Sequence, residues 1–187
     1  MNAGQLVVAT PVLDDPNFAR TVVLLLQADP DGGALGLVLN RPTGTAVDEV
    51  LPDWAPLSAG PPVVFTGGPV QPTAAICLGH GRLGRVAVAA YSELEGVPGG
   101  VVGTVDLDTP PEQLVGSVEH VRLFAGYAGW SPGQLEKEVE QGAWWVLDSL
   151  PADAFDNDPE HLWQRVLRRQ GPPIAFAASY PPDPTLN

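Results

Sequence analysis

Short runs of apolar residues rich in Val, Leu and Ala recur along the chain, and glycine and proline separate them at short intervals. The run Val22–Leu26 is apolar at every position, a pattern typical of strands that are buried on both faces. The segment that follows, Ala28–Gly33, holds proline and two glycines, which favour a tight turn and predict a hairpin. The strands that we expect are Gln5–Ala9, Thr21–Gln27, Ala34–Leu39, Val63–Thr66, Ala74–Leu78, Val86–Ala90, Val101–Leu107, Val121–Ala125, Trp144–Leu147 and Ile174–Ala178.

Helices are indicated by their capping patterns, in which Ser, Thr or Asp is followed by proline and then by Glu or Gln. Such starts lie at Thr109–Glu112, Ser131–Gln134 and Asp158–Glu160, and a fourth candidate covers Thr45–Leu51. Strands dominate the first two-thirds of the chain and helices the remainder. This order predicts an α+β fold with a three-layer character, in which helices flank a mostly antiparallel sheet.

Length and composition place the chain among folded domains. It has 187 residues, of which 44% are hydrophobic and 17% charged, so we expect a single domain over 1–187 with an extended tail at 180–187. Its formal net charge of -13 argues against nucleic acid or an anionic membrane as a partner. A single cysteine, Cys77, excludes an internal disulfide, and Met1–Gln5 lacks the basic start of a signal peptide. These features predict a cytoplasmic protein.

The candidate catalytic motifs each have a simpler structural explanation. Gly129–Gly133 matches the G-x-S-x-G pattern of a nucleophile elbow, but Pro132 lacks the N–H that would help to form an oxyanion hole. Cys77 lies in an apolar strand, where thiols are usually inert, so a pair with His80 is not expected. The acidic pairs Asp106/Asp108 and Asp156/Asp158 lack calcium-loop spacing. We therefore expect no catalytic residue, no metal and no cofactor.

For one glycine pair and one pair of arginines, the sequence leaves open whether the role is structural or is to bind an anion. Gly67 and Gly68 belong to no phosphate-binding fingerprint, so a close backbone approach explains them, with an anion-binding turn as the alternative. Arg20 and Arg41 are suited to anchor a carboxylate or phosphate, or to pair with acids such as Glu136 and stabilise irregular backbone. The basic cluster Arg165–Arg169 is expected to offset a helix dipole.

Several blocks of the sequence together resemble the bacterial YqgE/AlgH family. They are Ala9–Pro11, Asp15–Phe18, Arg20–Leu25, Gly33–Pro42, Gly67–Val70, Phe124–Glu136, Gly142–Trp144, Asp158–Pro159, Leu162–Trp163 and Gly171. The resemblance covers essentially the whole chain and implies one compact domain with a strand-rich pseudo-barrel and flanking helices. It implies no established reaction, although some members carry the label of transcriptional regulator.

The sequence departs from the family pattern at two places. Asp29 stands where the family often has His, and Ala74–Ala75 and Leu78–Gly79 stand where it often has Arg-Gly and Leu-His. His80 follows one position later than that histidine. Chemistry that depends on those side chains elsewhere in the family is therefore not expected here.

Three functions remain as hypotheses. The first is a non-enzymatic, regulatory protein that binds a small ligand or a protein partner. The second is an enzyme or binder that acts on a nucleotide or phosphorylated metabolite, with phosphate held by Gly67, Gly68 and an arginine. The third, direct DNA binding, has no support from the acidic charge. Five tryptophans are also compatible with a homodimer. The binding residues expected under the first hypothesis are Asn17, Arg20, Asn40, Arg41, Tyr127, Trp130, Gln134 and Glu136.

Overall fold

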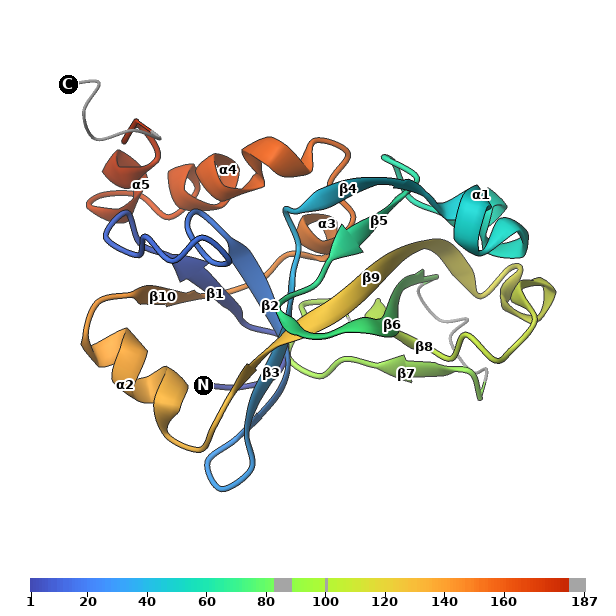
Figure 1. The fold of residues 1–187 in the computed structure, drawn as a ribbon, viewed down its shortest axis with the longest axis horizontal. Helices are drawn as coiled ribbons and strands as arrows, with labels where there is room; N and C mark the ends of the chain where they lie inside the picture. The colour runs from blue at the N-terminus through green and yellow to red at the C-terminus, as the bar shows by residue number, and fades with distance from the viewer. Residues whose placement is uncertain (83–88, 100, 182–187) are drawn as a thin grey trace.

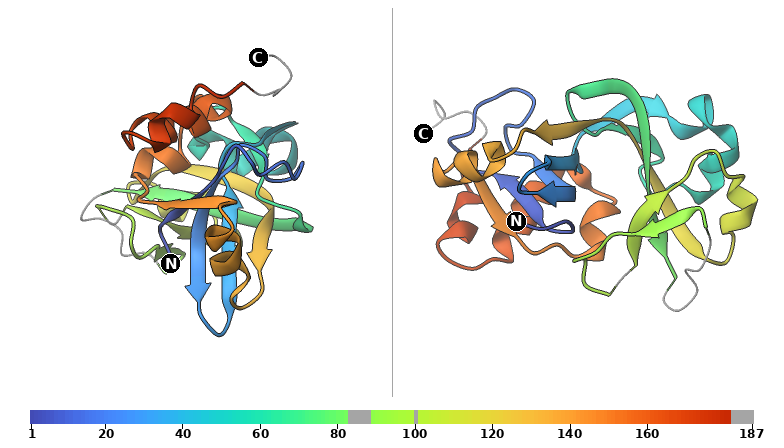
Figure 2. Two further views of the ribbon diagram at one scale, coloured as in Figure 1. Left: turned by 90° about the vertical axis from the view of Figure 1, so that its left-hand side faces the viewer. Right: turned by 90° about the horizontal axis from the view of Figure 1, so that it is seen from below.

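Ten strands form one strongly curved sheet in the computed structural model, which describes residues 1–82, 89–99 and 101–181 (Figures 1 and 2). The strands are β1 (Leu6–Ala9), β2 (Val22–Asp29), β3 (Gly33–Val38), β4 (Pro42–Ala46), β5 (Val63–Thr66), β6 (Val70–Gly81), β7 (Tyr91–Glu93), β8 (Val102–Val105), β9 (Val118–Trp130) and β10 (Trp144–Leu147).

Short helices flank this sheet. The α-helices are α1 (Val47–Val50), α2 (Gln134–Glu140), α3 (Pro151–Ala154), α4 (Leu162–Arg168) and α5 (Ile174–Ala177), and the 3-10 helices are η1 (Pro52–Leu57), η2 (Pro111–Leu114) and η3 (Pro159–His161). No helix among the described residues is both long enough and apolar enough to span a membrane.

Strand β9 organises the sheet because it is long enough to pair with three partners. The neighbours run in the order β10-β1-β2-β3-β9-β6-β8-β7. Every pair in this order is antiparallel, as expected. Two further pairs lie off this path. β4 pairs with β5 in antiparallel orientation, and β5 pairs with β9 in parallel orientation. The curled sheet and its helices form one compact domain.

The continuous apolar runs of β1 and β2 are explained by burial on both faces. Leu6, Val8, Val22 and Leu24 pack with α4 on one face, and Val7, Ala9, Val23 and Leu25 pack with α2 and β10 on the other. Both strands are therefore central in a three-layer arrangement at this end of the molecule. At the opposite end, a separate cluster around Trp54 and Leu114 places η1 and η2 beside β9.

The hairpin prediction is confirmed, and two of the helix predictions are confirmed in part. The β2–β3 hairpin forms, and the Asp29 carboxylate accepts backbone hydrogen bonds from Asp31 and Gly32 at 2.8 and 3.1 Å. The helix expected at Ser131 begins instead at Gln134; its side chain accepts a hydrogen bond from the Ser131 N–H at 3.0 Å, so half of the capping box exists. The helix expected at Thr109 shrinks to the 3-10 turn η2, and Val118 starts β9.

Three predictions need comment. Ile174–Ala178 was expected as a strand, but Ile174–Ala177 forms α5, because its apolar side chains pack against α4. The sequence pattern also missed β4 and β7, which are short and polar. Most of the strand expected at Val86–Ala90 lies outside the described residues, and residues 89–90 form a turn.

Candidate functional site

Strands β3 and β5 approach the same edge of β9 from opposite directions and end beside each other. β3 pairs with Ala128–Trp130 and β5 with Phe124–Ala125. The Val38 N–H donates to the Gly67 carbonyl at 2.8 Å and so connects the two strand ends. The carboxyl ends of β3 and β5 therefore converge at one point on the edge of β9.

Gly67 and Gly68 are required for the close approach of this junction to β9. A Cβ on Gly67 would lie 2.2 Å from the Gly126 carbonyl oxygen, and one on Gly68 would lie 2.2 Å from the Tyr127 carbonyl carbon. Gly68 also has φ 154°, a conformation that favours glycine. The close-approach interpretation of the Gly-Gly pair is confirmed.

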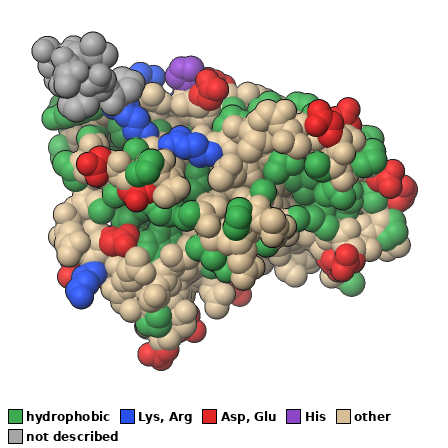
Figure 3. All heavy atoms as spheres, viewed as in Figure 1, with side chains coloured by type: hydrophobic (Ala, Val, Ile, Leu, Met, Phe, Trp, Pro, Cys, Tyr) green, Lys and Arg blue, Asp and Glu red, His purple; other side chains and the backbone are tan. Residues whose placement is uncertain are grey.

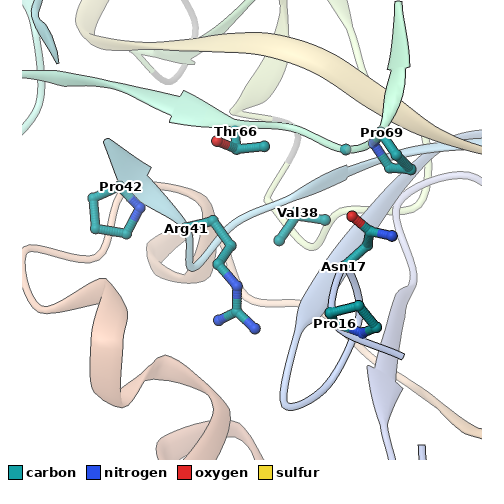
Figure 4. A pocket seen from close by; sticks show the side chains of 8 residues that line it. Pro16, Asn17, Val38, Arg41, Pro42, Thr66 and Pro69 are labelled. Carbon is teal, nitrogen blue, oxygen red and sulfur yellow. The ribbon is translucent and has the colours of Figure 1, made fainter. Parts of the chain in front are cut away.

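A pocket of about 220 Å³ opens at this junction. Val38 lies between Arg41 on one side and Asn17 on the other, and Thr66 and Pro69 lie across from Pro16 (Figure 4). Pro42 and Gly68 complete the lining. Three separate chain segments therefore meet here, namely the turn before β2, the β3–β4 connection and the end of β5.

Arg41 supplies the positive charge of the pocket. Its guanidinium donates to the carbonyls of Ala19 at 2.5 Å and Asn40 at 3.4 Å, both of which are neutral acceptors. Within the described part of the chain, no carboxylate lies within ion-pair distance of it. Burial lowers the pKa of the Arg41 guanidinium, but arginine stays charged at neutral pH. The Arg41 guanidinium is partly buried, and its hydrogen-bond acceptors are neutral carbonyls, so it is suited to attract an anion.

Asn40 stabilises the turn that forms one wall of the pocket. Its side chain is buried, donates to the Arg20 carbonyl at 2.8 Å and accepts from the Val22 N–H at 2.9 Å. Arg20 has φ 56°, which is uncommon for a residue other than glycine. Together with the Arg41–Ala19 hydrogen bond, these contacts determine the shape of the turn at 15–20.

Arg20 does not line the pocket. Its guanidinium donates to the Tyr180 carbonyl at 2.7 Å and to the Pro181 carbonyl, and it lies 4.8 Å from the centre of the Trp163 ring. Burial lowers its pKa as well. The two arginines that looked equivalent in the sequence therefore have different environments, and Arg20 connects the turn to the C-terminal segment.

Trp130 and Gln134 belong to a separate cluster centred on Glu138. The indole N–H groups of Trp130 and Trp144 donate to Glu138 Oε2 at 3.0 and 2.8 Å, and the Gln134 amide donates to Oε1 at 2.9 Å. The Phe18 ring packs against both indoles, with centroid distances of 6.1 and 5.5 Å. This network attaches α2 to β9 and β10.

The structure therefore divides the predicted binding residues. Asn17, Arg41 and Gly68 share the pocket, with Asn40 and Gly67 in the adjoining backbone, whereas Arg20, Trp130, Gln134, Tyr127 and Glu136 lie elsewhere. Tyr127 lines an open hollow beside the β2–β3 hairpin, and Glu136 faces a small cavity near Met1. Among the described residues, no carboxylate forms an ion pair with Arg20 or Arg41. The ion pair that we expected between these arginines and acids such as Glu136 is therefore not found there.

Sequence reasoning missed two polar residues with important contacts. Arg122 is 2% exposed within β9 and donates to the carbonyls of Gly60, Ala154 and Asp156; burial lowers its pKa to about 10. A charged residue inside an apolar strand run is a signal that could have identified it. Glu138 follows Gln134 by one helical turn, so its contact with Gln134 was also recognisable.

The remaining candidate residues are either buried in the core or engaged in ion pairs. Cys77 is buried, and burial raises the pKa of its thiol. Arg165 pairs with Asp156 and Asp158, and Arg169 pairs with Asp153, so this basic cluster forms ion pairs. Across residues 1–82, 89–99 and 101–181, no three His, Cys, Asp or Glu side chains converge in a way that would hold a metal ion.

Comparison with known proteins gives consistent matches along the chain. Residues 6–175 match the model of a family described as AlgH-like. The UPF0301 protein of Thermobifida fusca is 49% identical over 189 residues, covering 98% of this chain and 94% of its own. The UPF0301 protein of Streptomyces coelicolor is 50% identical over 187 residues, with the same coverage.

Two solved structures are also similar. A crystal structure of a Corynebacterium diphtheriae protein has a TM-score of 0.89 and 30% identity, covering 96% of this chain and 93% of that one. The solution structure of AlgH from Pseudomonas aeruginosa has a TM-score of 0.69 and 30% identity, covering 97% and 95%.

Proposed function

This chain belongs to the AlgH-like family of bacterial proteins, and we propose that it is a non-enzymatic binding or regulatory protein whose pocket beside Arg41 takes a small carboxylate or phosphate. The observation that carries the proposal is the environment of Arg41. Its guanidinium borders a pocket of about 220 Å³ and has neutral carbonyls as hydrogen-bond acceptors. An anion that replaces one of these carbonyls gains a charge-assisted hydrogen bond.

The pocket lining supports binding rather than acid–base chemistry. The described residues around it include an amide, a hydroxyl and a guanidinium, but no carboxylate, imidazole or thiol. Thr66 therefore has no neighbouring base in the pocket that would make its hydroxyl a nucleophile. This favours a binder over the enzyme that we considered as the alternative.

The size and charge of the site favour a small anion over a nucleic acid. A pocket of about 220 Å³ holds a small metabolite, and the net charge of -13 repels an extended phosphate backbone. The single reduced cysteine is consistent with the cytoplasm, where we propose that the protein works. A ligand that takes the Arg41 N–H groups competes with the Ala19 carbonyl, which links occupancy to the conformation of the turn at 15–20.

Isothermal titration with inorganic phosphate and a panel of small carboxylates and phosphorylated metabolites tests the proposal. We expect at least one saturable binder, whose affinity falls about tenfold or more in Arg41→Gln, because a hydrogen bond to a charged group is worth about 1.5–3 kcal/mol.

Arg168→Gln is the matched control, because Arg168 is exposed and lies outside the pocket. It should bind as tightly as the unmodified protein. A panel without any saturable binder, or equal losses in the two variants, would contradict the proposal. Turnover of a bound metabolite would instead support the enzymatic alternative.

A further inference from the structure

A groove separate from the Arg41 pocket lies at the opposite end of the sheet, between η1 and the segment that leads into η2. Its volume is about 330 Å³. It shares Leu107 and Asp108 with a second hollow of about 410 Å³ that extends over β6 and β8. The two hollows therefore adjoin at residues 107–108.

The groove is partly apolar, and its walls are stiff. Leu51 and Leu107 are half-buried and the prolines Pro52 and Pro110 are exposed, whereas Trp54 is buried beneath them. Proline restricts the backbone, so these walls are already ordered before a partner binds, which lowers the entropy cost of association.

Two exposed aliphatic side chains lie close in sequence to the lining segments. Val50 precedes Leu51 and is 50% exposed, and Val115 directly follows η2 and is 70% exposed. Exposed apolar surface with a polar rim is typical of protein interaction sites. Figure 3 shows hydrophobic surface gathered at the end of the molecule that carries α1, with carboxylates around its margin.

The rim of the groove is acidic and uncompensated. Asp53, Asp108 and Glu112 line it, and all three are exposed. None of them forms an ion pair with another described residue. Carboxylates around one hollow repel each other, and a cation placed among them relieves that repulsion.

The surrounding sequence strengthens this charge pattern. Residues 42–81 and 86–121 contain neither lysine nor arginine. Their acidic residues are Asp48, Glu49, Asp53, Glu93, Glu95, Asp106, Asp108, Glu112 and Glu119. The lysine and arginines of the chain lie in the remaining segments, and of these acidic residues Glu119 pairs with His80 and Arg82 among the described residues.

We propose that this groove, lined by Asp53, Trp54, Leu107, Asp108, Pro111 and Glu112, docks a basic, partly apolar peptide segment of another protein. Lysine or arginine side chains of the segment contact the three carboxylates, and an apolar side chain between them packs on Leu51, Leu107 and Pro110. This site is independent of the Arg41 pocket, so either proposal can fail without the other.

Fluorescence anisotropy with defined peptides tests the proposal. The probe is a fluorescein-labelled peptide of about ten residues in which lysines and leucines are separated by serines. Two comparison peptides replace either the lysines by glutamine or the leucines by serine. We expect the lysine–leucine peptide to bind saturably and both comparison peptides to bind more weakly, since binding uses charge and apolar contact together.

Two matched triple variants separate the groove from the general acidity of the protein. Asp53→Asn, Asp108→Asn and Glu112→Gln remove three charges at the groove. Asp14→Asn, Asp31→Asn and Glu140→Gln remove three exposed charges elsewhere. We expect the groove variant to weaken binding about tenfold, from three exposed ion pairs, and the control variant less than twofold. Raising the salt concentration should narrow this difference.

Three outcomes would overturn the proposal. The first is equal binding of the lysine–leucine and glutamine peptides, and the second is equal weakening by the two triple variants. The third is equal binding of the peptides with and without leucine. Sedimentation velocity adds a fourth test, because self-association that disappears only in the groove variant would assign the groove to a second copy of this chain.

Discussion

Replacing Glu138 tests whether Trp130 and Gln134 have a structural role rather than a ligand-binding one. One carboxylate oxygen accepts both indole N–H groups, from Trp130 at 3.0 Å and Trp144 at 2.8 Å. The other oxygen accepts the Gln134 amide at 2.9 Å. The two indole side chains are 6% and 2% exposed, so water has little access to their N–H groups once the acceptor is removed.

The expected loss of stability follows from these two donors. A nearly buried donor without an acceptor costs about 1–3 kcal/mol, so Glu138→Ala should reduce the free energy of unfolding by about 3 kcal/mol. Glu138→Gln retains one acceptor oxygen and should cost about 1 kcal/mol. Glu140→Ala is the control, because Glu140 is exposed on the same helix, and its effect should stay within about 0.5 kcal/mol.

Guanidinium chloride unfolding followed by tryptophan fluorescence and far-UV circular dichroism measures these differences. Coincident transitions from the two probes justify a two-state analysis. The reasoning is refuted if Glu138→Ala lies within about 1 kcal/mol of the unmodified protein, given the cost of an orphaned buried donor. It is also refuted if Glu138→Gln is as unstable as Glu138→Ala, because the acceptor oxygen would then be irrelevant.

Three further predictions concern the buried polar, thiol and acidic groups. Asn40→Leu should lower the free energy of unfolding in urea by about 2–3 kcal/mol, because it leaves the buried Val22 N–H and the partly buried Arg20 carbonyl without partners; a loss below about 1 kcal/mol would contradict this. Burial raises the pKa of the Cys77 thiol, so Ellman's reagent at pH 8 should react with it only after denaturant is added, and rapid labelling of the native protein would show the reverse. Hydrogen bonds from His161 and then Arg165 lower the pKa of Asp158 in the folded state. The stability that Asp158 contributes is therefore present above its unfolded pKa of about 3.9 and lost as the pH falls below it. Asp158→Asn should flatten the acid side of the stability curve, whereas parallel curves for the two proteins would disprove the assignment.

Local chain chemistry was sufficient to predict much of the architecture. The uninterrupted apolar run Val22–Leu26 indicated burial on both faces, and α4 and α2 cover those faces. The turn residues before Gly33 predicted the β2–β3 hairpin, because proline and glycine restrict or permit backbone angles wherever they occur. These signals act over a few residues, and for this reason they are readable without the tertiary structure.

Short apolar runs were ambiguous for the opposite reason. A four-residue segment such as Ile174–Ala177 carries too few positions to show a period of two or of 3.6. Its helical conformation depends on packing against α4, which is a tertiary contact. The polar strand Pro42–Ala46 likewise exists because β5 pairs with it, and its own side chains do not indicate a strand.

The candidate site was decided by the tertiary structure. The sequence selected Arg20 and Arg41 as equal candidates, since residue type and the flanking motifs did not distinguish them. Arg20 contacts the carbonyls of Tyr180 and Pro181, about 160 residues away along the chain, whereas Arg41 borders a pocket. The composition determined the net charge of the protein and indicated that it folds, and the order of apolar runs, glycines and prolines predicted its short strands. Which polar groups remain accessible to a ligand depends on contacts between distant segments, and those contacts exist only after β3 and β5 meet on β9.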